Sequence, residues 1–290
     1  MTASGEPRDF DAERRAIHDL WEDAAAGWGR QRAAWSEQTA AVADRMIELL
    51  DLAPGQRLLE LAGGTGEVGF RALPRIMPGG TLIASDQSQA MVDVAREHAR
   101  ELGLDGAAIE FRLLNGEWID LEVATVDRVL CRWGYMLMAD PAAALRETRR
   151  VLRSGGRVTL AVWDERGLNP WSSVPHGVLA EHGLTRPPLP GEPGPFALAD
   201  RAHLRGLLEE AGFAEIAIEP VDLVRASADF EQWWAMQLDL SVATRNAMAN
   251  ADAATTQRIE AEVAARFAQY TDTRGALAVP GRAVVAVADA

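Results

Sequence analysis

The sequence predicts an α/β fold in which a mainly parallel sheet is wound on both faces by helices. Three observations predict it: an apolar run ends in a glycine-rich loop at residues 58–66, strand and helix patterns alternate from there to residue 213, and two further strand patterns follow. Such alternation is typical of βαβ units. We therefore expect a doubly wound sheet of about seven strands, the last of them antiparallel.

Two helices are expected before the first strand. Apolar residues recur at helical spacing over residues 9–27 and again over residues 42–50, ahead of a Pro-Gly turn. Trp28 lies between two glycines, and two interpretations stay open for it: a core anchor for the helical pair, or an aromatic side chain that closes over a ligand pocket. Residues 1–52 would form an N-terminal helical cap.

The glycines after the first strand predict a binding site for a small ligand. Gly63, Gly64 and Gly66 lack a Cβ, so backbone amides can approach a ligand closely at the positive end of the next helix. Glu60 ends the strand, and a carboxylate suits a cationic amino group better than a pyrophosphate. The loop and Gly69 also satisfy the dinucleotide fingerprint as a string, so a nicotinamide cofactor stays open.

The ends of the next strands bring more polar groups to the same edge of the sheet. Asp86 follows the strand expected over residues 81–85 and suits a ribose diol, although a helix N-cap is the alternative. The strand expected over residues 109–114 precedes Asn115-Gly116-Glu117-Trp118, and that over residues 126–131 precedes Arg132-Trp133-Gly134-Tyr135. Carboxyl ends of parallel strands form the usual ligand crevice.

Two motifs carry a family resemblance. Glu60-Leu-Ala-Gly-Gly-Thr-Gly66 resembles the first motif of class I S-adenosylmethionine-dependent methyltransferases, an acidic residue followed by G-x-G-x-G, with Ala62 at the first family glycine. We expect this alanine to cost fit without abolishing binding, provided that it keeps a negative φ. Residues 144–158 are similar to the R-V-L-x-P-G-G signature of the quinone-biosynthesis-like, type 11 small-molecule methyltransferases, with Ser154 replacing the proline. The resemblance spans residues 25–225.

The resemblance implies a Rossmann-like methyltransferase domain over residues 53–290, with lid segments at about 164–200 and 227–273. It implies S-adenosylmethionine as cofactor and S-adenosylhomocysteine as product. Asn115 would offer a carbonyl acceptor to the adenine amine, and Trp118 either a stacking face or a structural contact. The cofactor contacts that it implies are Glu60, Ala62, Gly63, Gly64, Gly66, Asp86, Gln87, Met91, Asn115, Gly116, Glu117 and Arg132.

The amino-acid composition limits the kinds of molecule that this protein is expected to bind. The charge is 29 − 43 = −14, which disfavours nucleic acid and anionic membranes, so a small-molecule substrate is expected. All basic residues apart from histidine are arginines, which excludes a Schiff-base or P-loop lysine. Cys131 is the only cysteine, and no membrane-length apolar run occurs, so we expect a cytoplasmic protein. A homodimer stays open.

The expected chemistry is methyl transfer by direct displacement to a small, aromatic or lipophilic metabolite. Positioning supplies most of the catalysis, and a base is optional; His176 and Tyr135 are the candidates. No carboxylate cluster follows the fourth strand, so no metal is expected. Two alternatives stay open: a methyltransferase-fold protein with a different reaction or a regulatory role, and an NAD(P)-dependent oxidoreductase. The expected substrate pocket, whose aromatic residues could equally pack a lid, comprises Trp28, Trp133, Tyr135, Trp163 and Trp171.

Overall fold

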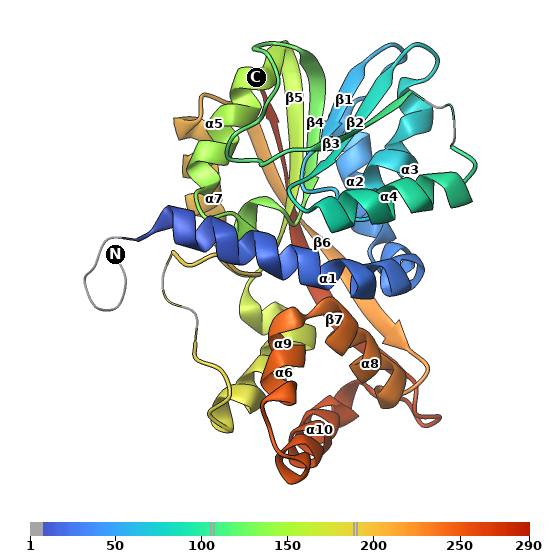
Figure 1. Cartoon of the computed structure of the whole chain (residues 1–290), viewed down its shortest axis with the longest axis vertical. Coiled ribbons are helices and arrows are strands. Elements are labelled where there is room, and N and C mark those ends of the chain that lie inside the picture. The colour runs from blue at the N-terminus through green and yellow to red at the C-terminus, as the bar shows by residue number, and fades with distance from the viewer. Residues whose placement is uncertain (1–7, 105, 107, 188, 190) are drawn as a thin grey trace.

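The computed structural model describes residues 8–104, 106, 108–187, 189 and 191–290. Its centre is a seven-stranded sheet of order β3-β2-β1-β4-β5-β7-β6 (Figure 1). β7 is antiparallel to both of its neighbours, and β1 to β5 pair in parallel, which confirms the predicted sheet. The strands are β1 (Arg57–Glu60), β2 (Thr81–Asp86), β3 (Ile109–Leu113), β4 (Val126–Arg132), β5 (Leu152–Trp163), β6 (Ala214–Ser227) and β7 (Leu277–Asp289).

Helices cover both faces of this sheet. Figure 1 shows α5 and α7 on one side and α2, α3 and α4 on the other. Because the central strands are buried on both faces, they read as continuous apolar runs such as Leu58-Leu59 in β1, where both side chains are fully buried. The helices of the two layers are α2 (Ala40–Leu50), α3 (Glu67–Ile76), α4 (Gln89–Glu101), α5 (Pro141–Val151) and α7 (Arg201–Glu210).

The N-terminal segment is one long helix, α1 (Phe10–Gln38), which crosses the molecule below the sheet (Figure 1). The helix predicted over residues 9–27 therefore continues through Trp28 to Gln38. A Cβ on Gly27 would overlap the carbonyl oxygen of Asp239, so this glycine permits close approach of α8 (Phe230–Leu240). That packing outweighs the cost of glycine inside a helix, about 1 kcal/mol relative to alanine.

A second group of helices lies beyond the carboxyl ends of the parallel strands (Figure 1). The long strands β6 and β7 extend toward it. The segment of about residues 164–200, expected to form part of a lid, contains a helix that begins at Pro170, where proline is accommodated in the first turn. Pro188 and Pro190 of the proline-rich loop lie outside the described residues. The group comprises α6 (Pro170–Glu181), α8 (Phe230–Leu240), α9 (Val242–Ala249) and α10 (Ala253–Phe267), with short 3₁₀ turns at Tyr135–Leu137, Arg166–Leu168 and Ala268–Tyr270.

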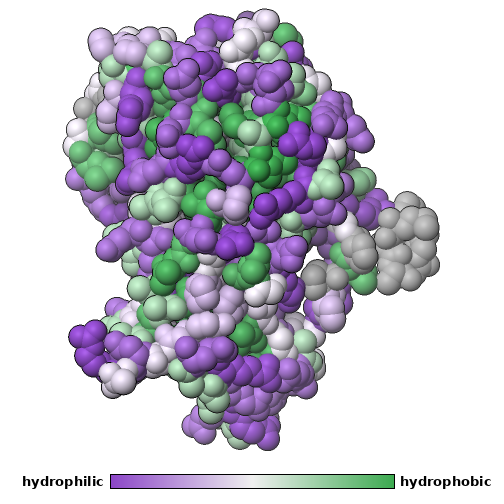
Figure 2. Space-filling model, turned by 180° about the vertical axis from the view of Figure 1, so that it is seen from behind, coloured by the Kyte–Doolittle hydropathy of each residue, from purple (hydrophilic) through white to green (hydrophobic). Residues whose placement is uncertain are grey.

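The surface is mixed in character. Figure 2 shows hydrophobic residues in separate groups among polar ones on the face seen from behind. In the described part of the chain, no helix has the length and hydropathy needed to cross a membrane.

Candidate functional site

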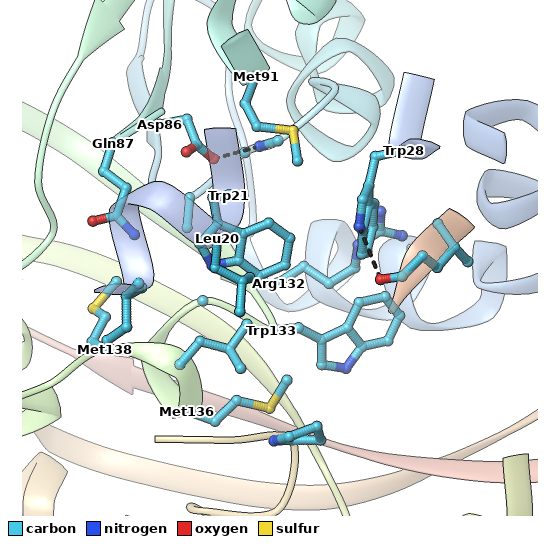
Figure 3. Close-up of a pocket in the computed structure, with 18 of the residues that line it drawn as sticks. Leu20, Trp21, Trp28, Asp86, Gln87, Met91, Arg132, Trp133, Met136 and Met138 are labelled. Atoms are coloured by element: carbon cyan, nitrogen blue, oxygen red, sulfur yellow. Dashed lines mark hydrogen bonds between the residues drawn. The ribbon is translucent and has the colours of Figure 1, made fainter. Parts of the chain in front are cut away.

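A cavity lies at the carboxyl ends of β1, β2, β4 and β5, and the inward face of α1 borders it. In Figure 3, Asp86, Gln87 and Met91 lie on one side of it and Trp28 and Trp133 on another. With the exception of Gly66, every predicted cofactor contact lines this cavity. The lining residues among them are Glu60, Ala62, Gly63, Gly64, Asp86, Gln87, Met91, Asn115, Gly116, Glu117 and Arg132.

Glu60 is a buried carboxyl group with one unpaired oxygen. Its Oε1 accepts a hydrogen bond of 2.9 Å from the backbone N–H of Gly69, whereas Oε2 has no partner among the described residues. Burial raises the pKa of Glu60 to about 8, against the effects of the Gly69 N–H and of Arg132. Glu67 and Asp86 raise it further. The group is therefore mainly protonated at neutral pH, and a cation beside Oε2 would favour its ionised form.

The start of the glycine loop is held on both sides of Ala62. The N–H of Leu61 donates to Leu130 of β4, and that of Gly63 donates to Ser85 of β2. Between them Ala62 has a φ of +51°, so the condition of negative φ, on which the expected mild effect of this alanine depends, is not met. Because the chain must turn out of β1 within one residue, the alanine adopts the left-handed conformation, which costs about 1–2 kcal/mol for a residue with a Cβ.

Asp86 links this loop to the next helix. Its Oδ2 accepts from the N–H of Gly64 at 2.9 Å, and its Oδ1 accepts from that of Ser88 at 3.0 Å. Ser88 is the N-cap of α4, since its Oγ accepts from the N–H of Met91. The N-cap alternative for Asp86 therefore does not hold. Its carboxylate fixes the loop and also lines the cavity.

The segment after β3 connects the cavity to α1. Asn115 Oδ1 accepts from the N–H of Glu117 at 2.8 Å, so the oxygen expected to face adenine already has one partner. Glu117 accepts from Arg14 Nε and from the N–H of Ala139, both at 2.8 Å. Trp118 is 78% exposed and does not itself line the cavity, so the stacking role considered for it finds no support.

Arg132, the last residue of β4, lines the cavity. Its Nη1 donates to Thr39 Oγ1 at 2.7 Å, and its Nη2 donates to Glu67 Oε2 at 2.6 Å. This pair is mostly buried. The guanidinium also lies over the ring of Trp133. Arg132 is thus already neutralised by a carboxylate, and the same holds for Arg14.

Tryptophans form the opposite wall. Six tryptophan rings follow one another in a row, and the distances between successive ring centroids are 5.7, 5.4, 5.3, 4.3 and 4.6 Å. The pair at 4.3 Å, Trp133 and Trp163, is stacked. The four tryptophans predicted for the substrate pocket line the cavity. Two on α1 were missed, although a seven-residue spacing on one helix face is a signal for them. In order of contact the rings are Trp21, Trp28, Trp35, Trp133, Trp163 and Trp171.

The two candidate bases lie in different surroundings. Tyr135 is fully buried outside the lining, and its hydroxyl donates to Thr148 Oγ1 at 2.6 Å, because Thr148 donates to Ala144. Burial raises the pKa of Tyr135 well above its ordinary value. The structure therefore does not bring Tyr135 into the cavity.

His176 does line the cavity, from α6. Its Nδ1 lies 2.8 Å from the carbonyl oxygen of Ser172, which can only accept, so in the neutral ring Nδ1 carries the proton. Burial lowers the pKa of His176. The imidazole is therefore neutral at physiological pH, with an unprotonated Nε2.

Arg225 is a lining residue that sequence reasoning missed. It is 1% exposed, and its Nη1 donates to Gln237 Oε1 at 3.2 Å, while Nε and Nη2 are without partners among the described residues. Its guanidinium lies 5.2 and 5.1 Å from the ring centres of Trp35 and Trp171, and 5.7 Å from that of Trp233. Burial lowers the pKa of Arg225 to about 9, so the group remains cationic at neutral pH.

Comparison with known proteins agrees with this geometry. Residues 31–167 match the model of the ubiE/COQ5 methyltransferase family. Over this segment, which is a little under half of the chain, the sequence is similar to that family. The ubiquinone/menaquinone biosynthesis C-methyltransferase UbiE of Pasteurella multocida is 31% identical over 128 residues, 44% of this chain and 47% of that protein. The UbiE of Acidiphilium cryptum is 37% identical over 112 residues, 38% and 43%. The chain thus spans less than half the length of either relative.

Solved structures share the class I methyltransferase fold over more of the chain. The YcgJ protein of Bacillus subtilis aligns with a TM-score of 0.57 at 15% identity, covering 85% of this chain and 97% of its own. A phosphoethanolamine N-methyltransferase 2 of Haemonchus contortus, solved with phosphomonomethylethanolamine and S-adenosylhomocysteine, aligns with a TM-score of 0.57 at 14% identity, covering 94% and 59%. At these identities the likeness establishes the fold.

Proposed function

We propose that this protein is an S-adenosylmethionine-dependent methyltransferase that acts on a small, aromatic or lipophilic metabolite. One observation carries the proposal: a single cavity joins the glycine loop and the acidic strand ends to a wall of tryptophans. The first part suits a cofactor with a cationic amino group and a ribose. The second suits a planar or apolar acceptor.

The residues present fit the cofactor. Glu60 Oε2 is a buried acceptor without a partner among the described residues, and a cationic amino group would satisfy it. A Cβ on Gly63 would overlap the Glu60 carboxyl group, so this glycine leaves room for the carboxylate. Asp86 also lines the cavity, and its carboxylate is held by the N–H groups of Gly64 and Ser88 without an arginine, so it is a poor neighbour for the pyrophosphate of a nicotinamide dinucleotide.

Catalysis would rest mainly on alignment of the acceptor. When bound, S-adenosylmethionine supplies a methyl group activated by its sulfonium, and the protein has to hold the acceptor atom in line with it. Trp133, which follows β4, and Trp163, which ends β5, are stacked at 4.3 Å and would form the surface against which a planar acceptor is held. For a hydroxyl acceptor, His176 Nε2 would take the proton, a contribution of roughly 10²–10⁴-fold.

We also propose that α1 and the helices of residues 164–200 and 227–273 cover the acceptor. α1 is tied to this group by Trp28 Nε1, which donates to the Leu240 carbonyl at 3.3 Å, and by the ion pair of Asp23 and Arg245 at 2.6 Å. Residues 53–290 would then form the catalytic domain, and residues 1–52 its N-terminal helical cap. Of this cap, the structure describes residues 8–52.

Calorimetry with S-adenosylmethionine, S-adenosylhomocysteine and NAD tests the proposal. We expect the first two to bind and NAD not to bind. Glu60→Ala and Asp86→Ala should each weaken binding by about 1.5–3 kcal/mol, the value of a charged hydrogen bond. Asp222→Ala, at an exposed ion pair on β6, is the matched control. NAD binding without any response to the methyl donor would refute the assignment.

A further inference from the structure

Arg225 is a buried cation that lacks a buried anion. In the described part of the chain no carboxylate lies within ion-pair distance of it, and burial alone accounts for the change in its pKa. A guanidinium has five N–H donors, and here only Nη1 has a protein acceptor, the amide oxygen of Gln237. The residue lines the cavity. Arg225 is therefore an unpaired, buried donor group in the lining of the space that we assign to the ligands.

The two unsatisfied nitrogens lie on one edge of the guanidinium. Nε–H and Nη2–H point in parallel, and this edge binds the two oxygens of a carboxylate. Other arginines of this protein use it in that way. Arg157 donates from Nε and Nη2 to Asp289 at 2.6 and 3.1 Å, and Arg71 donates to Asp44 at 2.5 and 2.7 Å. The free edge of Arg225 has the shape that a carboxylate fills.

A purely structural role does not account for this side chain. Removing an unpaired cation from water is costly, and the rings of Trp35, Trp171 and Trp233 offset only part of that cost. A methionine or leucine would fill the same volume among these rings without the penalty. An interaction made only when a ligand is present explains why the charge is retained.

The position of Arg225 assigns this interaction to the acceptor. β6, which carries Arg225, forms one edge of the sheet, and β4, β5 and β7 separate it from β1 and β2 with Glu60 and Asp86. The other arginines of the cavity, Arg14 and Arg132, are already paired with Glu117 and Glu67. One free cation among the described lining residues matches a single negative charge.

We propose that the acceptor is a planar, apolar molecule with one carboxylate, which pairs with Nε and Nη2 of Arg225 beside Trp35 and Trp171. That the bound molecule is the methyl acceptor rests on the proposed function. The anion site itself rests only on the geometry of Arg225, so the two can fail separately.

The test measures binding of acids and of their neutral amides. Calorimetry with the full chain, saturated with S-adenosylhomocysteine, would compare 2-naphthoate with 2-naphthamide and cinnamate with cinnamamide. In the wild type we expect the acid of at least one pair to bind about ten- to a hundredfold more tightly than its amide. Arg225→Met should abolish this preference, and Arg225→Lys should retain part of it. Arg282→Met, at the exposed ion pair with Asp222, is the control and should leave it unchanged.

The outcomes separate the two proposals. If no acid binds better than its amide in the wild type, the inference is overturned, whatever the variants do. If Arg225→Met weakens binding of S-adenosylhomocysteine and leaves the acid preference intact, the cation serves the cofactor and the inference is wrong. If S-adenosylhomocysteine does not bind the wild type but the acids still do, with a preference that depends on Arg225, the anion site stands and the proposed function fails. If Arg225→Met does not fold, the comparison of each acid with its amide in the wild type and in Arg225→Lys decides whether the inference holds.

Discussion

Glu60 offers the sharpest test of the cofactor site, because its protonation should change when the cofactor binds. Its pKa is raised from 4.5 to about 8 by burial, so at pH 6.5 the free protein holds the group almost fully protonated. A cationic amino group beside Oε2 would return this pKa toward its ordinary range. Binding of S-adenosylmethionine at pH 6.5 should therefore release about one proton from Glu60.

The perturbation is Glu60→Gln, which keeps the shape of the side chain and removes the titration. Calorimetry in two buffers of different ionisation enthalpy measures the protons released on binding. We expect the wild type to release about one proton more than the variant. The affinity of the wild type should also rise by about tenfold per pH unit below pH 8, a dependence that the variant lacks. Equal proton release in the two proteins would refute this role for Glu60.

The same pKa makes a prediction for stability. Because the pKa of Glu60 is higher in the folded than in the unfolded protein, the native state binds more protons between pH 4.5 and 8. The contribution of this group is therefore complete below pH 4.5 and is lost as pH rises through 8, by at most roughly 4–5 kcal/mol. Urea unfolding without cofactor should show this loss in the wild type, and its absence in Glu60→Gln is the control.

Three further predictions concern single residues. Ala62→Gly should raise the free energy of unfolding by about 0.5–1 kcal/mol, because relief of the left-handed strain exceeds the entropy cost of glycine; an unchanged midpoint in urea would contradict this. His176→Gln should lower kcat for a hydroxyl acceptor by roughly 10²–10⁴-fold while calorimetry shows unchanged affinity for S-adenosylhomocysteine, and equal kcat would remove the histidine from the mechanism. Gly27→Ala should cost about 1–3 kcal/mol in urea unfolding, because its Cβ overlaps Asp239, whereas Gly29→Ala, whose nearest contact is a side chain at 3.3 Å, should cost less.

Features that depend on local chemistry could be predicted from the sequence. Asp140 before Pro141 and Asp200 before Arg201 both form the N-caps that their types and positions indicate. The strands of the sheet were visible as apolar runs, because a parallel strand buried on both faces needs apolar side chains throughout. The glycine loop was visible because close backbone approach requires residues without a Cβ.

Features that depend on distant partners could not be predicted in this way. The continuity of α1 at Gly27 depends on Asp239, more than 200 positions along the chain, and local propensity argues against it. Tyr135 turns away from the cavity because Thr148 accepts its hydroxyl. Arg225 lies in a strand pattern like any exposed arginine, and only its burial among tryptophans reveals its part in the cavity.

The continuous row of indole rings gives this protein an optical property of its own. Of its nine tryptophans, those that line the cavity lie close enough for excitation energy to pass from one ring to the next. A ligand that quenches one of these rings will therefore quench its neighbours as well. Trp118, exposed to solvent, emits separately and can be silenced with a soluble quencher. We therefore expect the fluorescence of the unlabelled chain to change when a ligand occupies the cavity, on a constant background from Trp233 and Trp234, which do not line it.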